Sequence, residues 1–302
     1  MKKTISVVGA IVALLSVAFL VSQLIQHLTE IPSFNVNLAS CLIILVAVLV
    51  FGVEFALGVI AWVILLRGGS IALPFKDAYA IMGKAQIAKY LPGNVFHFVG
   101  RLTAGTRAGL STEGIALSMG LETLLLAATA GMIALIGFLS GWVAPYWSFG
   151  LVGEKNFLPI IVALGAILIL AGFSMYIRGG KAWVQRRLTY LHPAIIGCTI
   201  AIYGAAFLVN GLVIRMLLNG VWIVHSDLPW YRFSCGYALA WVMGFIVPGA
   251  PGGIGIREAV FVGLFGKEIG EGLATGLGLL LRVITSGADL GTLAIAWRLR
   301  SH

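Results

Sequence analysis

Long apolar segments, separated by short polar stretches, cover most of the chain. Six are long enough to cross a membrane as helices: Ile5–Ile25, Leu38–Leu66, Glu113–Leu139, Leu158–Ile177, Pro193–Leu218 and Gly272–Trp297. A helix needs about 20 residues to cross the hydrocarbon core of a bilayer. Because these segments are continuously apolar rather than alternating, they favour helices over the strands of a barrel. The pattern predicts an all-α polytopic membrane protein with about six full spans.

Two regions between these segments have a different pattern. Each of Phe75–Leu110 and Tyr231–Phe265 consists of a moderately apolar arm, a Pro-Gly break and a second short arm. A helix does not continue through such a break, and each second arm is too short to span a bilayer. We predict two re-entrant hairpins, or broken helices, that line a cavity.

The two halves of the chain resemble each other at a constant offset of 156 positions. Gly120–Gly131 and Gly276–Gly287 are then identical at six of twelve positions. The offset also superposes the first three spans on the last three. Each half has an odd number of crossings, so the pattern predicts an inverted repeat with halves at roughly 1–150 and 151–302 of a single membrane domain. Coincidence in a Leu- and Gly-rich chain is the competing explanation. The offset aligns Pro92, Gly93, Arg101 and Glu54 with Pro248, Gly249, Arg257 and Asn210.

Composition and charge support a membrane protein and suggest its orientation. Hydrophobic residues make up 60% of the chain and charged residues 10%, whereas soluble domains are about a quarter charged. The net charge of +9 comes from basic residues in loops between apolar segments, so no nucleic-acid partner is expected. With the N-terminus inside, fourteen basic residues fall in cytoplasmic segments and six elsewhere. This distribution predicts an integral plasma (inner) membrane protein with both termini in the cytoplasm.

The glycine-rich segment before Arg257 is the most unusual stretch of the chain. Glycines let a ligand approach the backbone, and a helix beginning just after them would direct free N–H groups at an anion. Arg257 adds a donor suited to phosphate or carboxylate, and Lys84 and Arg107 would extend a cationic vestibule on the cytoplasmic side. The alternative is a tight turn whose glycines only permit close packing of helices. The predicted substrate-binding residues are Lys89, Arg101, Gly252, Gly253, Gly255, Arg257 and Glu258.

Charged residues inside membrane spans are rare and are candidates for function. One interpretation is a polar pathway with a proton-linked site at Glu54 or Glu122. The other is a structural ion pair between helices, for example Glu122 with Arg282. The predicted intramembrane pathway consists of Glu54, Glu122, Asn210, Arg282 and Asp289.

The cysteines and histidines do not have the spacing of a metal site. Cys41, Cys198 and Cys235 lie in apolar segments and are interpreted as small hydrophobic residues. The sequence therefore predicts no metal and no cofactor.

Two motifs carry a resemblance to a known family. The first is Ala88–Asn94 (AKYLPGN) followed by Gly100-Arg101, and the second is Pro248–Glu258 (PGAPGGIGIRE). Together they resemble the flippase-like, lysylphosphatidylglycerol synthase transmembrane-region family, over essentially the whole chain. The resemblance implies movement of lipid between membrane leaflets. Because the chain ends at His302 without the aminoacyl-transferase domain of the best-known members, lysyl-transferase activity is not expected.

These observations lead to one function hypothesis and its rivals. The main hypothesis is a lipid translocase, and not an enzyme, that moves a phospholipid such as phosphatidylglycerol or a polyprenyl-linked lipid. The alternative is a proton-coupled secondary transporter of a small anionic solute. A membrane-embedded lipid enzyme and a non-transporting assembly partner are further rivals. Besides the lipid substrate, the candidate partners are enzymes of envelope-lipid or glycan synthesis and further copies of the chain.

Overall fold

The computed structural model describes residues 37–90, 95–143, 192–222, 224, 226–246 and 251–299. All regular structure within these ranges is helical. The predicted spans Ile5–Ile25 and Leu158–Ile177 lie outside the described residues, as do the Pro-Gly pairs at the tips of both predicted hairpins.

Long apolar helices confirm that the chain is an integral membrane protein. Four helices in the described part of the chain are long and apolar enough to cross a membrane. Their bounds agree closely with four of the six predicted spans, so the described residues account for four spans rather than six. These helices are α2 (Leu38–Gly68), α5 (Thr112–Leu139), α8 (Pro193–Val221) and α11 (Glu271–Arg298).

Local capping explains where these long helices begin. The Asn37 side chain accepts from the Ser40 amide at 2.8 Å, and the Ser40 hydroxyl accepts from the Asn37 amide at 3.0 Å. Ser111 caps α5 through the Gly114 amide at 3.2 Å, and α8 has Pro193 in its first turn. Side-chain caps satisfy backbone donors that have no partner inside a helix, and a proline at the first position loses no hydrogen bond.

The regions with Pro-Gly breaks form two pairs of short helices. α4 has 12 residues and α10 has 14, so at 1.5 Å per residue they are about 18 and 21 Å long. A hydrocarbon core is about 30 Å thick, and neither helix crosses it alone. The first pair is α3 (Phe75–Gln86), 3-10 turn η1 (Ile87–Tyr90) and α4 (Phe96–Arg107); the second is α9 (Trp230–Ile246), turn η3 (Pro251–Gly253) and α10 (Ile256–Ile269).

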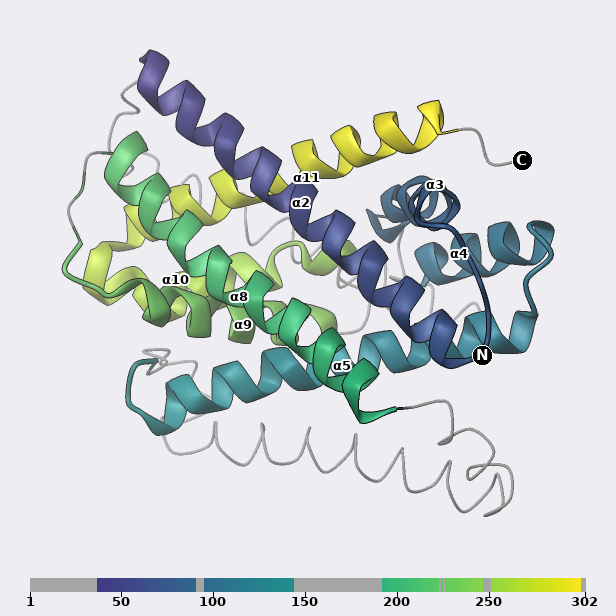
Figure 1. Cartoon of the computed structure of the whole chain (residues 1–302). Helices are drawn as coiled ribbons and strands as arrows, with labels where there is room; N and C mark the ends of the chain where they lie inside the picture. The colour runs from purple at the N-terminus through teal and green to yellow at the C-terminus, as the bar shows by residue number, and fades with distance from the viewer. Residues whose placement is uncertain are drawn as a thin grey trace, which may run out of the picture.

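The helices pack so that both short pairs meet inside the bundle (Figure 1). α2 packs along α8, α5 packs against α9, and α11 packs against α3. Turns η1 and η3 contact each other. In the second half, α8, α9, α10 and α11 begin 155 to 160 residues after α2, α3, α4 and α5, respectively.

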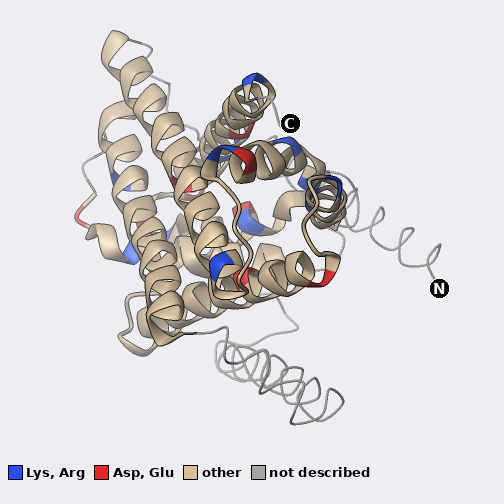
Figure 2. Cartoon of the chain, turned by 45° about the vertical axis from the view of Figure 1, so that its right-hand side comes forward, with Lys and Arg blue, Asp and Glu red and all other residues tan. Residues whose placement is uncertain are grey.

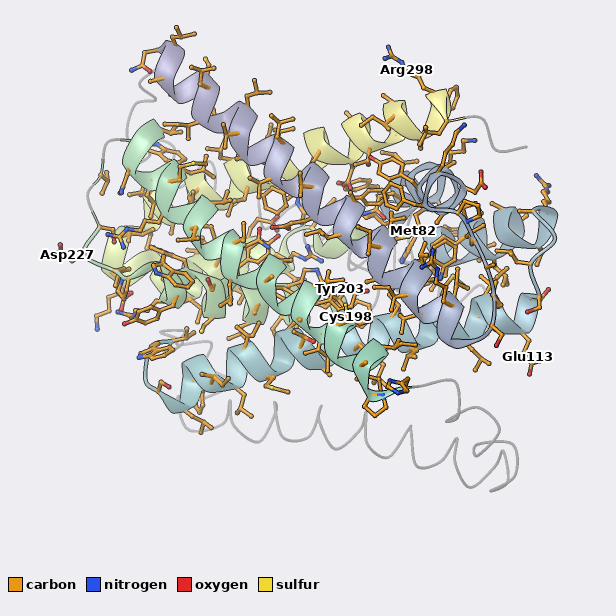
Figure 3. The ribbon with its side chains drawn as sticks, in the orientation of Figure 1. Met82, Glu113, Cys198, Tyr203, Asp227 and Arg298 are labelled. Carbon is orange, nitrogen blue, oxygen red and sulfur yellow. The ribbon has the colours of Figure 1, made fainter. Side chains whose placement is uncertain are left out.

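Many large apolar side chains point outward from the long helices. Leu49 of α2, Met132 of α5, Leu212 of α8 and Val283 of α11 are all exposed. Exposed apolar faces of this kind suit contact with lipid chains. Figure 3 shows that the labelled charged residues Glu113, Asp227 and Arg298 lie at the periphery of the bundle, whereas Tyr203 lies inside it.

Candidate functional site

A cavity of about 320 Å³ lies between the long helices and the two short helix pairs. Charged residues lie within the bundle as well as at its ends (Figure 2). The cavity brings together residues from the predicted substrate-binding group and from the predicted intramembrane pathway. Of the predicted site residues, Lys89, Arg101, Gly252, Arg257, Glu54, Glu122, Asn210, Arg282 and Asp289 line it. Gly253 and Gly255 lie in sequence between the lining residues Gly252 and Arg257, and Glu258 lines a smaller adjoining pocket.

Arg101 and Glu122 form a buried ion pair on one side of the cavity. The Arg101 Nη2 atom lies 2.6 Å from Glu122 Oε2, and both residues are less than 10% exposed. The guanidinium lies 4.3 Å from the ring centroid of Trp62, within cation–π range. Glu122 therefore forms an ion pair between helices, as one of the two interpretations held, but with Arg101 instead of Arg282, which was named there as an example. The closer partner comes from α4, which follows the first Pro-Gly break and packs against α5.

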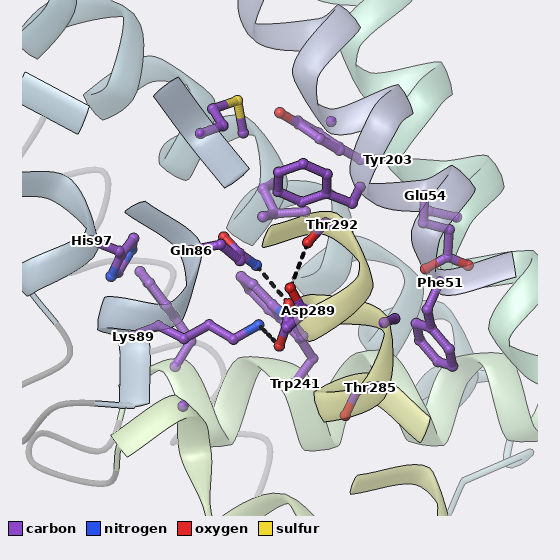
Figure 4. A pocket seen from close by; sticks show the side chains of 18 of the residues that line it. Phe51, Glu54, Gln86, Lys89, His97, Tyr203, Trp241, Thr285, Asp289 and Thr292 are labelled. Atoms are coloured by element: carbon purple, nitrogen blue, oxygen red, sulfur yellow. Dashed lines mark hydrogen bonds and ion pairs between the residues drawn. The ribbon is translucent and has the colours of Figure 1, made fainter. Parts of the chain in front are cut away.

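Asp289 is the centre of a second cluster, which ties turn η1 to α11 (Figure 4). Lys89 Nζ lies 2.7 Å from Asp289 Oδ2, and the Tyr90 hydroxyl donates to the same oxygen at 2.5 Å. Gln86 donates to Asp289 Oδ1 at 3.2 Å. Burial lowers the pKa of Lys89, and the neighbouring Asp289 carboxylate opposes this shift.

Glu258 holds the glycine-rich loop in place rather than facing the main cavity. Its Oε2 accepts from the Gly255 amide at 2.8 Å, and its Oε1 accepts from Arg282 Nε at 2.8 Å. Arg282 also donates to the carbonyl of Gly252 at 3.2 Å. Both carboxylate oxygens of Glu258 are thus engaged within the protein. The predicted role of Glu258 in substrate binding gains no support from this geometry.

Arg257 differs from the other cations of the cavity because no carboxylate of the described residues pairs with it. Its Nε atom is buried without a hydrogen-bond partner in the described part of the chain. The guanidinium lies 5.6 Å from the ring centroid of Trp241. The side chain is half-buried, and a partly buried cation that no described carboxylate neutralises is costly, so the position favours an anionic ligand.

Two glycines make room for the Arg257 side chain. A Cβ atom on Gly244 would lie 2.6 Å from Arg257 Cγ, and one on Gly253 would lie 2.7 Å from Arg257 Nε. Gly253 also has a positive φ of 73°, which other residues rarely adopt. Gly253 was among the predicted site residues, and Gly244 was not. In the sequence, Gly244 is only a small residue within the apolar segment of α9 and belongs to no distinctive motif.

Glu54 lies on another wall of the cavity, together with Phe51 of the same helix (Figure 4). The Asn210 amide donates to Glu54 Oε2 at 3.4 Å. Oε1 of Glu54 and Oδ1 of Asn210 are buried and have no hydrogen-bond partner among the described residues. No cation of the described residues lies within ion-pair distance of Glu54.

Other predicted basic residues lie away from the cavity. Lys84 and Arg107 are exposed and are absent from its walls, so the predicted vestibule is reduced to Lys89 and Arg101. His97, which no motif indicated, lines the cavity. Burial, with the nearby Arg101 and Lys89 charges, lowers its pKa to about 4.

The described residues contain no cluster of His, Cys, Asp and Glu side chains that would hold a metal ion. No protein-family model matches the sequence, and no curated protein matches it either.

Proposed function

We propose that this protein is a lipid translocase that binds the anionic headgroup of a phospholipid or polyprenyl-linked lipid at Arg257. The observation that carries the proposal is the Arg257 guanidinium, on the wall of a cavity within a membrane bundle, with which no carboxylate of the described residues pairs. Lys89, Arg101 and Arg282 already have carboxylate partners at 2.6 to 2.8 Å. An incoming phosphate would thus pair with Arg257 without breaking an ion pair between described residues.

The cavity is of a size that suits a headgroup and not a whole lipid. Its volume of about 320 Å³ is near the lower end of the usual range for small-ligand sites, roughly 300–1,000 Å³. The acyl or prenyl chains would remain in the bilayer, against the apolar outer faces of the long helices. The resemblance to the flippase-like family supports a lipid rather than a free solute.

The same proposal includes an inverted repeat with six full spans, both termini in the cytoplasm and a location in the plasma membrane. Three observations support the repeat. Corresponding helices in the two halves begin 155 to 160 residues apart. α2 packs along its proposed counterpart α8. The repeat would relate α5 to α11 and α9 to α3, and both of the corresponding contacts, α5 with α9 and α11 with α3, are present. Repeats of this kind place substrate sites at their interface, near the bilayer midplane.

A proton-coupled transporter of a small anion is the second candidate. The Glu54 carboxyl, which lines the cavity without a basic partner among the described residues, favours proton linkage in either case. The two candidates differ in whether the anion that meets Arg257 carries a lipid tail.

Leaflet exchange in proteoliposomes tests the proposal. We would measure exchange of labelled phosphatidylglycerol and of a labelled polyprenyl phosphate, with uptake of inorganic phosphate as the solute comparison. Wild-type protein and Arg298→Ala, whose arginine is exposed at the end of α11, should exchange at least one lipid. Arg257→Ala should lose that exchange while it remains folded by circular dichroism and size-exclusion chromatography.

Either of two results would contradict the proposal. Exchange by folded Arg257→Ala at the wild-type rate would remove Arg257 from the site. Uptake of phosphate with no movement of either lipid would instead support the transporter of a small anion.

A further inference from the structure

Glu54 and Asn210 form one hydrogen bond in the described structure, and a second bond between their side chains would need one more proton. The Asn210 amide donates to one oxygen of the Glu54 carboxyl, at 3.4 Å. The remaining oxygens, Glu54 Oε1 and Asn210 Oδ1, are both buried and without partners in the described residues. Both are acceptors when Glu54 is ionised. One proton on Glu54 would turn its carboxyl into a hydrogen-bond donor, and the Asn210 amide oxygen could accept that hydrogen bond.

No described residue supplies Glu54 with a cation instead. The basic residues that line the cavity either pair with other carboxylates or, like Arg257, lie beyond ion-pair distance of Glu54. An ionised carboxylate in such a site is unfavourable unless it is paired. The titratable groups of the described residues that face α2 or the cavity come from every surrounding element: Tyr79 of α3, Lys89 and Tyr90 of η1, His97 and Arg101 of α4, Glu122 of α5, Tyr203 of α8, Tyr237 of α9, Arg257 of α10, and Arg282 and Asp289 of α11.

We infer that Glu54 is a proton-binding site, and that the protein carries one proton on Glu54 together with each anionic headgroup at Arg257. This inference rests on the proposed function and adds the energy source for lipid movement, which is the proton gradient. Both residues line one cavity, so the proton and the anion would move together. A proton and a headgroup with one negative charge add no net charge to the cavity, which lowers the cost of moving the headgroup through a low-dielectric region.

Proton binding can be measured without any transport. Infrared difference spectra of the protein in lipid nanodiscs should show the carbonyl band of a protonated carboxylic acid, which disappears as the pH rises. The band should be absent from Glu54→Gln and present in Asp227→Asn, a change at an exposed carboxylate far from the cavity. A band that persists in Glu54→Gln would overturn the inference.

Coupling is tested by leaflet exchange under an imposed pH gradient. At one proton per lipid, one unit of pH gradient should shift the distribution of a trace labelled lipid between leaflets by about tenfold. Because glutamine resembles the protonated carboxyl, Glu54→Gln should still exchange lipid but should give the same distribution with or without the gradient. His97→Gln serves as a control for the cavity histidine, whose pKa burial lowers to about 4, and should stay coupled.

The outcomes separate the inference from the proposed function. Lipid exchange by the wild type that does not respond to the gradient would overturn the coupling and leave the translocase intact. A response that persists in Glu54→Gln would do the same. If the wild type moves neither lipid, the proposed function fails, and the infrared measurement still decides whether Glu54 holds the proton.

Discussion

Asn210 donates its side-chain amide to Glu54, with 3.4 Å between Nδ2 and Oε2, across the contact between α8 and α2. The two residues are 156 positions apart, which is the offset at which the two halves of the sequence align. In a repeat related by a two-fold axis, equivalent residues meet only close to that axis. In the proposed repeat, their contact therefore places the two-fold axis close to Glu54 and Asn210. Both residues line the cavity.

The proposed repeat is asymmetric in its charges. The offset aligns Arg101 with Arg257, but the position of Glu122 corresponds to Gly278 in the second half. Arg101 is thus neutralised by the Glu122 carboxylate on α5. For Arg257, the corresponding position on α11 is a glycine and offers no carboxylate. Similarly, Glu54 has Asn210 as its counterpart rather than a second acid. One cation and one acid remain without counter-ions in the described part of the cavity, and these are the two residues to which we assign substrate and proton.

Glu122→Gln should destabilise the protein strongly, because it leaves the Arg101 guanidinium buried without its counter-ion. Breaking a buried pair by removing one partner costs about 3–5 kcal/mol. We expect a clear fall in the midpoint of thermal unfolding in detergent. The matched control is Glu268→Gln, which breaks the exposed pair of Glu268 with Arg232 and should cost about 1 kcal/mol or less. Equal shifts for the two variants would contradict the structural role of the Arg101 pair.

Asp289→Asn should make Lys89 more reactive toward an amine-modifying reagent. Burial lowers the pKa of Lys89, and the Asp289 carboxylate counteracts that effect. Removing the negative charge lowers this pKa further, so a larger fraction of the amine is neutral and nucleophilic. Mass spectrometry after brief acylation would compare Lys89 with the exposed Lys84 in the same molecules. An unchanged ratio of labelling would show that Asp289 does not control the charge on Lys89.

Much of the helical architecture was predictable, because membrane spans have a strong and simple signal. The predicted Leu38–Leu66 and the observed α2 (Leu38–Gly68) differ only at the last two residues. The start of α10 at Ile256 was also predicted, since the glycines before it stop any preceding helix. The two other predicted spans, outside the described residues, stay predictions.

The composition of the cavity was predictable and its pairing was not. Charges within apolar segments identified Glu54, Glu122, Arg282 and Asp289 as one pathway, and all four line the cavity. The partner of each charge depends on how the short helices pack, and sequence spacing does not report this. The ion pairs of Lys89 with Asp289 and of Arg282 with Glu258 were accordingly missed, as was the role of Gly244.

Gly211→Ala should disrupt the packing of α8 on α9. A Cβ atom at Gly211 would lie 2.6 Å from the Ser234 amide nitrogen and still closer to the Trp230 carbonyl oxygen. Backbone atoms cannot yield as a flexible side chain can, and overpacking typically costs about 1–3 kcal/mol. Gly197→Ala, in the same helix but with open space around the added carbon, should be neutral or slightly stabilising. The yield of monodisperse protein and its unfolding temperature would distinguish the two variants, and equal behaviour would contradict the packing of α8 on α9.

Gly244→Ala should impair transport without removing any charge. The added carbon would lie 2.6 Å from Arg257 Cγ, in the middle of the side chain, so the guanidinium must leave its place beside Trp241. Displacing a binding group by about 1 Å can reduce a rate by up to about a hundredfold. We therefore expect lipid exchange to fall by between about tenfold and a hundredfold, approaching the loss in Arg257→Ala. Gly120→Ala on α5, where nothing lies within 4 Å of the added carbon, should exchange lipid as the wild type does.

Comparing Gly244→Ala with Arg257→Ala separates position from charge at this site. The substituted residue lies inside α9, where alanine is a better helix former than glycine, so the fold should be retained. Unfolding temperatures close to that of the wild type would confirm this and assign the defect to Arg257. Full exchange by a folded Gly244→Ala variant would mean that the headgroup does not depend on where the guanidinium lies, and Arg257 would then contribute only its charge to the potential of the cavity.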